Sequence, residues 1–186
     1  MTAKLTAVEL GSASISRFRP LLDDEAWRDL ESTMRQLAAA LRGRVLWNVN
    51  STARGGGVAE LLADLIPYDR GAGVDERWLV IEGSRPFFDV TKRIHNLLHG
   101  VPSDGLEFSA EERHEYKQTL AGNAAALAQV VRPGDVVLIH DPQAAGLVPP
   151  LVDHGAHVIW RSRAMYGKDW TQVGSTPSRR RSIPSR

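Results

Sequence analysis

The sequence contains no cysteine among its 186 residues, and only 6% of them are aromatic. The absence of cysteine excludes disulfides and thiolate metal sites. No apolar run approaches the roughly 18 residues that a membrane span needs. Residues 1–20 carry no apolar segment of the kind found in secretory signals. We therefore expect a cytoplasmic protein that does not interact with membranes.

The remaining composition is that of a globular domain, with 42% hydrophobic and 24% charged residues. The net charge of +1 hides an asymmetry, because seven basic residues and one acidic residue lie from Arg161 onward. The body before them is mildly acidic, which argues against a nucleic-acid partner. The basic tail could be read as a nucleic-acid arm. Its Ser, Pro and Arg composition buries little, however, and favours an irregular or disordered end over residues 164–186.

Hydrophobic periodicity predicts strands that alternate with helices. The expected strands cover residues 44–50, 77–82, 135–140 and 157–160. The expected helices cover residues 24–42, 58–65, 87–99 and 144–152. A further long helix is expected to start at a capping box formed by Ser109 and Glu112 and to end before Pro133. Pro67 is expected to close the second helix. Tryptophans 27, 47, 78 and 160 fall in apolar stretches and are expected in the core. Strands this continuously apolar predict an α/β fold with a doubly wound parallel sheet.

Polar and glycine-rich residues follow three of the predicted strands, at 50–57, 83–88 and 140–143. In sheets of this kind, ligands bind beyond the carboxyl ends of the strands. The candidate binding residues are therefore expected at one edge of the sheet.

Gly55, Gly56 and Gly57 lie between a predicted strand and a predicted helix. Glycines there let a ligand approach the backbone, and the amides that open the helix could face a phosphate or a sugar hydroxyl. The same glycines could instead form a permissive turn without a ligand. Their spacing is neither that of a P-loop nor the G-x-G-x-x-G pattern of nicotinamide-dependent dehydrogenases. No dinucleotide or other cofactor is therefore expected.

His140-Asp141-Pro142-Gln143 ends the third predicted strand. Its histidine and aspartate could bind hydroxyl groups at the rim of the sheet. The alternative is a polar turn in which Asp141 caps the next helix. On another predicted helix, His95 and His99 share one face, but Asn96 stands where a zinc protease motif has glutamate. No metal is expected.

Three segments together resemble the glycosyltransferring trehalose synthases. They are WNVNSTARGGGVAELLADLIPY (47–68), WLVIEGSRPFFDVTKRIHNLLHG (78–100) and VVLIHDPQAAGL (136–147), in that order and with matching separations. The resemblance covers residues 21–161. It implies a Rossmann-like domain that is the N-terminal half of a retaining GT-B glycosyltransferase. Such an enzyme transfers glucose from a nucleoside diphosphate glucose (NDP-glucose) donor to a glucose acceptor and makes α,α-trehalose.

The resemblance also implies roles for particular residues. Gly55, Gly56 and Gly57 would approach the donor diphosphate and the acceptor. His140 would be the catalytic histidine that hydrogen-bonds the transferred sugar. The remaining implied substrate-binding residues are Asp141 and Gln143 in the sugar pocket, Lys92, His95 and Asn96 on an acceptor-side helix, and Arg161 after the last strand.

Two departures from the family pattern bear on activity. Arg163 stands where the family has a histidine, and the resemblance stops after it. We therefore expect an acceptor-side domain over residues 1–163, an irregular tail over 164–186, and no nucleotide-binding domain in this chain. Without that domain the chain is expected to be inactive alone, and its open half-cleft would favour a homo-oligomer. The alternatives are a trehalose phosphorylase fragment and a non-catalytic sugar-binding or interaction domain.

Overall fold

The computed structural model describes residues 4–98, 100–101 and 107–162. Its elements alternate as the sequence predicts. They are β1 (Thr6–Ala7), the 3-10 helix η1 (Ile15–Leu21), α1 (Asp24–Ala40), β2 (Leu46–Asn50), α2 (Gly57–Gly71), β3 (Glu76–Val80), α3 (Arg85–Leu98), α4 (Ala110–Leu127), β4 (Val136–His140), the 3-10 helix η2 (Pro142–Leu147), α5 (Val148–Asp153) and β5 (His157–Arg161). The predicted tail and His99 lie outside the described residues. No helix within those residues is long and apolar enough to cross a membrane.

The five strands form one sheet in the order β1-β3-β2-β4-β5. Strands β3, β2, β4 and β5 are parallel, which confirms the predicted Rossmann-like α/β fold. The chain moves outward from β2 to β3, then returns past β2 to form β4 on the other side. The edge strand β1 was not predicted; it pairs antiparallel with β3 through only two residues, Thr6 and Ala7.

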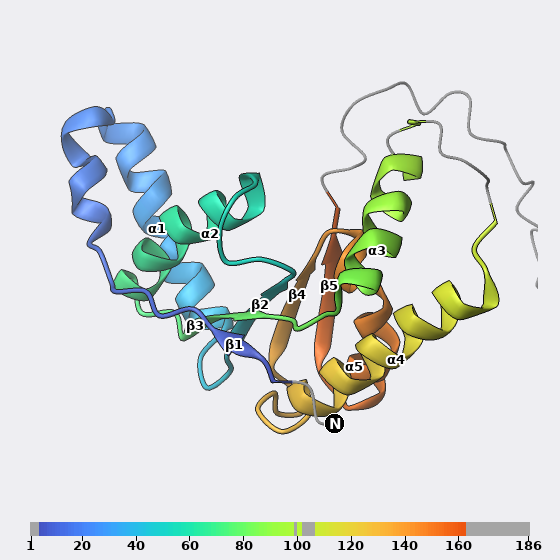
Figure 1. The fold of residues 1–186 in the computed structure, drawn as a ribbon. Helices are drawn as coiled ribbons and strands as arrows, with labels where there is room; N and C mark the ends of the chain where they lie inside the picture. Colours follow the sequence, from blue (N-terminus) through green and yellow to red (C-terminus); the bar gives the residue numbers. More distant parts are fainter. Residues whose placement is uncertain (1–3, 99, 102–106, 163–186) are drawn as a thin grey trace, which may run out of the picture.

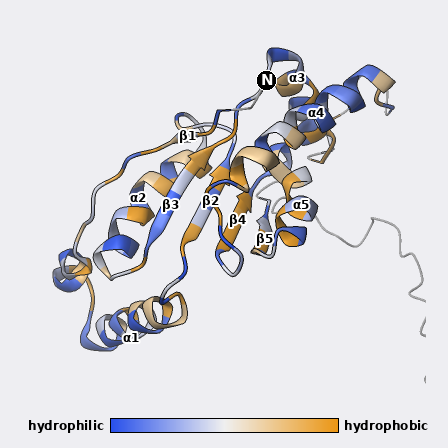
Figure 2. Cartoon of the chain, turned by 90° about the horizontal axis from the view of Figure 1, so that it is seen from below, coloured by the Kyte–Doolittle hydropathy of each residue, from blue (hydrophilic) through white to orange (hydrophobic). Residues whose placement is uncertain are grey.

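Helices cover both faces of the sheet (Figure 1), with α2 on one side and α3, α4 and α5 on the other. The larger apolar cluster joins the inward residues of β2 and β4 to α3, α4 and α5 and includes Val49, Phe87, Leu127 and Ile139. A smaller cluster joins α2 to Trp78 of β3. In Figure 2 the hydrophobic colour gathers on β4 and on parts of the neighbouring strands, while α1 and α4 carry much of the hydrophilic surface. The apolar strands are therefore the centre of the fold.

Pro67 does not close the second helix, contrary to the prediction. It lies inside α2, which continues to Gly71. The amide of Ala13 donates to the Pro67 carbonyl at 2.7 Å, and Ile66 before it is fully buried. Burial of the apolar face of α2 thus outweighs the backbone hydrogen bond that proline cannot make. The prediction treated the proline as a local signal and missed this tertiary support.

Two other predictions were wrong in detail. Residues 144–152 do not form one helix, because the 3-10 helix η2 ends at Leu147 and α5 begins at Val148 with two prolines in its first turn. Prolines are tolerated there because the first amides of a helix have no partner within it. Trp160 is not in the core: 43% of it is exposed, since β5 is an edge strand.

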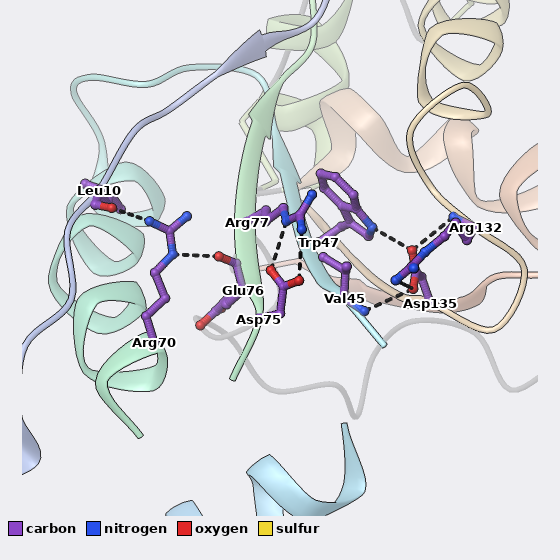
Figure 3. A network of polar contacts seen from close by, with 9 residues as sticks. All are labelled: Leu10, Val45, Trp47, Arg70, Asp75, Glu76, Arg77, Arg132 and Asp135. Atoms are coloured by element: carbon purple, nitrogen blue, oxygen red, sulfur yellow. Dashed lines mark hydrogen bonds and ion pairs between the residues drawn. The ribbon is translucent and has the colours of Figure 1, made fainter. Parts of the chain in front are cut away.

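The amino-terminal edge of the sheet is held by the buried carboxylate of Asp135 (Figure 3). It accepts hydrogen bonds from the Val45 amide at 3.0 Å, from Trp47 Nε1 at 3.1 Å and from the Arg132 amide at 3.0 Å. On the other side of β3, Arg70 donates to the carbonyl groups of Leu10 and Glu76. The contacts of Asp135 tie β2 to β4, and those of Arg70 tie the segment after β1 to β3, all at the end opposite the predicted binding residues.

Candidate functional site

The candidate site lies at the carboxyl ends of β2 and β4, where the strand order reverses. These two strands are hydrogen-bonded neighbours, with Val49 opposite Ile139. The glycine turn follows β2, and the His-Asp-Pro-Gln turn follows β4. A reversal of strand order leaves a crevice between the two outgoing connections. The two turns that the sequence singled out are therefore adjacent at one edge of the sheet.

The glycine turn has a backbone that favours glycine. Gly55 has φ 71° and Gly56 has φ 93°, both in the left-handed region. A Cβ added at either position would meet nothing within 4 Å, so the glycines are required by conformation and leave the space above them open. Gly56 precedes the first turn of α2 and provides no side-chain cap for its amides. Asn50 and Thr52 hold the turn by bonding to the carbonyls of Thr52 and Arg54, each at 2.7 Å.

His140 is the last residue of β4 and is buried. Its Nε2 lies 2.9 Å from Oδ1 of Asn48 on β2. Its Nδ1 is enclosed by protein and has no hydrogen-bond partner within the described part of the chain. Burial, with a smaller contribution from the positive charge of Arg161, lowers the pKa of His140 from 6.5 to about 4. The imidazole is therefore neutral at physiological pH.

Asp141 has φ 63° and ψ 171°, a combination found almost only in glycine. The Asp141 amide donates to the Arg161 carbonyl at 2.8 Å, and Trp160 Nε1 donates to the Asp141 carbonyl at 3.0 Å. These contacts to β5 hold a conformation that costs about 1–3 kcal/mol in backbone strain. The alternative in which the Asp141 carboxylate caps the next helix is wrong, because the side chain bonds to no amide of η2.

Gln143 and Arg161 complete the part of the site near His140. The Oε1 atom of Gln143 is buried and has no partner within the described residues. Arg161 stands opposite His140 in the pairing of β4 with β5. Both belong to elements that border the edge where His140 lies.

Lys92, His95 and Asn96 are on α3, which packs against η2 and so borders the same edge. Lys92 is exposed, while His95 and Asn96 are half-buried. Within the described residues, no hydrogen bond joins the side chain of Lys92 or Asn96 to His140 or to the glycine turn. The structure therefore brings α3 to this edge of the sheet through its packing on η2. Within the described ranges, no group of three or more acidic or histidine side chains could hold a metal ion.

Sequence reasoning missed two polar residues behind His140. Asn48 and Glu76 are buried, and Asn48 Nδ2 donates to Glu76 Oε1 at 2.6 Å. Burial is the main cause that raises the pKa of Glu76 from 4.5 to about 8, and the nearby Asp69 raises it further. The signal was present in the run LWNVN, where Asn48 and Asn50 alternate with apolar residues and so share one face of β2.

The fold is that of a Rossmann-like α/β domain, and the two turns lie at the edge where sheets of this topology bind ligands. The profile of the family described as trehalose synthase, N-terminal domain, matches residues 48–173. The chain belongs to this family, as the three segments predicted.

The chain is similar to several known proteins of trehalose metabolism. The trehalose synthase of Rubrobacter xylanophilus is 37% identical over 160 residues, which are 84% of this chain and 36% of that protein. The trehalose phosphorylase of Pleurotus pulmonarius is 33% identical over 135 residues, 69% of this chain and 18% of that protein. A solved α,α-trehalose-phosphate synthase (UDP-forming) from Burkholderia vietnamiensis has a TM-score of 0.47 at 18% identity and covers 63% of this chain and 32% of its own. The chain thus spans about a third of the trehalose synthase and less of the phosphorylase.

Proposed function

We propose that this chain is the acceptor-side half of a retaining glucosyltransferase that makes trehalose from NDP-glucose and glucose. The observation that carries the proposal is the family match over residues 48–173, which includes both turns at the crevice. Those turns lie at the edge where a sheet of this topology binds ligands.

The residues at the crevice support a role in binding sugar. The open space above Gly55 and Gly56 would admit a phosphate or a sugar close to the backbone. The neutral His140 would hydrogen-bond a hydroxyl of the transferred glucose, and Asp141, Gln143 and Arg161 would line the pocket beside it. Lys92, His95 and Asn96 would approach the acceptor from α3, which packs on η2.

In this proposal the nucleotide is bound by a second domain of the GT-B type, separate from the acceptor-side domain. The chain spans 36% of the R. xylanophilus trehalose synthase, which leaves room for such a domain in that protein. We assign residues 1–163 to the acceptor-side domain and keep residues 164–186 as a separate tail. Stabilising the leaving diphosphate is a main source of rate in such transfers, and in this proposal the second domain supplies it. The chain alone is therefore proposed to be inactive.

A trehalose phosphorylase is the second candidate, because P. pulmonarius trehalose phosphorylase is 33% identical over much of the same region. Such an enzyme would use phosphate in place of the nucleotide. The synthase is preferred because the matched family is that of trehalose synthases and because these relatives are more similar, at 36–40% identity.

The experiment is an assay for trehalose with three proteins: this chain, and two fusions in which it replaces the matched segment of the R. xylanophilus synthase or the P. pulmonarius phosphorylase. With glucose and NDP-glucose, the synthase fusion is expected to make trehalose and the chain alone none. The phosphorylase fusion, given glucose and glucose 1-phosphate, is expected to be inactive.

The matched control is the synthase fusion carrying His140→Gln, which should lose activity while remaining folded. Trehalose made by the chain alone would refute the need for a second domain. A folded synthase fusion without activity would refute the transferase proposal, and activity of the phosphorylase fusion alone would favour the second candidate.

A further inference from the structure

Three buried polar side chains form a line across one face of the sheet. His140 on β4 contacts Asn48 on β2, and Asn48 contacts Glu76 at the start of β3. All three residues are at most 5% exposed. Since buried polar groups are costly unless they are hydrogen-bonded, this line is a specific feature of the central sheet.

The direction of the hydrogen bonds follows from the chemistry of Asn48. Its Nδ2 group can only donate, and Glu76 Oε1 lies 2.6 Å away. Its Oδ1 can only accept, and His140 Nε2 lies 2.9 Å away. In this arrangement the proton of the neutral imidazole is on Nε2, and Nδ1 is left as an acceptor.

The reversed arrangement would need Glu76 to donate from Oε1 and would leave a proton on His140 Nδ1. Two observations disfavour it. Glu76 Oε1 already lies against Asn48, and Asp69 acts on the Glu76 carboxyl both as a hydrogen-bond partner and as a negative charge, so Oε2, which has no closer partner within the described residues, is the better place for a proton. At the other end, the reversed arrangement would put that proton on the buried Nδ1 of His140, which has no partner within the described residues. An unpaired buried N–H is also rarer than an unpaired acceptor.

We propose that Asn48 and Glu76 are positioning residues, which hold His140 as the imidazole protonated on Nε2 and keep Nδ1 bare to accept a hydrogen bond from a sugar hydroxyl. The last part rests on the proposed function. Because Nδ1 is enclosed, a hydroxyl can reach it only if the next turn, which contains the strained Asp141, shifts. His140 then orients a hydroxyl and does not deliver a proton.

The test is a long-range ¹H–¹⁵N correlation spectrum of the whole chain with ¹⁵N-labelled histidine, recorded at pH 7 without sugar. The chain has six histidines, and His140→Gln identifies the signals of His140. The expected result is a protonated Nε2 and an unprotonated Nδ1. Asn48→Leu should move both nitrogen shifts toward a mixture of tautomers, while Glu76→Gln, which keeps an acceptor oxygen for Asn48, should leave them unchanged.

Asn48→Asp covers the case in which Asn48→Leu does not fold. Its carboxylate still accepts from Nε2 and should shift His140 toward the doubly protonated form. A proton on Nδ1 in the natural chain, or nitrogen shifts that neither Asn48 variant changes, would overturn the proposed positioning.

Adding glucose or trehalose separates this inference from the function on which it rests. A change at Nδ1 on addition of sugar supports both. If the tautomer is as expected but neither sugar changes the His140 nitrogens, the positioning by Asn48 and Glu76 stands and the sugar site is wrong.

Discussion

Replacing Glu76 with glutamine is expected to raise the free energy of unfolding at pH 9 by about 3 kcal/mol and to change it little below pH 4.5. Burial, aided by Asp69, raises the pKa of Glu76 from 4.5 to about 8. Between these values the folded chain keeps a proton that the unfolded chain has lost. The stability of the natural chain therefore falls as the pH rises through this window. A glutamine has no such proton to lose.

The measurement is urea unfolding of both proteins at pH 5, 7 and 9. His140 acts in the opposite sense, because its lowered pKa of about 4 makes stability rise between pH 4 and 6.5. That effect is present in both proteins and cancels in their difference. Glu60→Gln, at an exposed position of α2, is the matched control and should show no such trend. If the difference in free energy of unfolding between the natural chain and Glu76→Gln does not change with pH, the raised pKa of Glu76 in the folded chain is contradicted.

Replacing Asp135 with alanine is expected to lower the free energy of unfolding by about 3 kcal/mol at pH 7. The substitution removes the acceptor for the Val45 amide and for Trp47 Nε1, both on residues that are almost fully buried. Each donor left without a partner in the interior costs about 1–3 kcal/mol. Burial alone would raise the pKa of Asp135, but the hydrogen bonds from Val45, Arg132 and Trp47 outweigh it and lower that pKa.

Urea unfolding at pH 7 measures this loss, with Asp153→Ala at an exposed helix end as the control. Asp135→Asn keeps one acceptor oxygen and should fall between the natural chain and the alanine variant. Because the pKa of Asp135 is lowered in the folded chain, its contribution is complete above the unfolded value of 3.8 and declines as the pH falls further. An alanine variant as stable as the control would show that Asp135 does not hold the edge of the sheet.

The central strands could be predicted because they are largely buried and rich in apolar residues. Strand β1 gave no such signal, because its two residues are exposed, show no periodic pattern and pair with β3 only through tertiary contact. The course of α2 past Pro67 was missed for the same reason, since the bond from Ala13 comes from 54 residues earlier in the chain. Local signals thus located the main elements and failed where distant segments supported a locally unfavourable conformation.

The candidate site, like the fold, could be predicted from the sequence only in part. The glycine turn and the His-Asp-Pro-Gln turn could be located because polar residues follow apolar strands, and the strand order then makes them neighbours. The contacts of Asn48 join residues 92 and 28 positions apart in the chain. The alternation in LWNVN predicts that Asn48 and Asn50 share one face of the strand, but it does not predict that Asn48 contacts His140 and Glu76. The φ of Asp141 is held by β5 and has no local signal.

The most direct test of the sugar site is a titration of the ¹⁵N-labelled chain with glucose, followed through its backbone amide signals. We expect concentration-dependent shifts at the Gly55–Gly57 turn together with shifts at residues 140–143, and the loss of both in His140→Gln but not in His114→Gln on the exposed surface of α4. Shifts confined to the opposite edge of the sheet, near Gly43 and Gly134, or no saturable shift at all, would contradict a sugar site between β2 and β4.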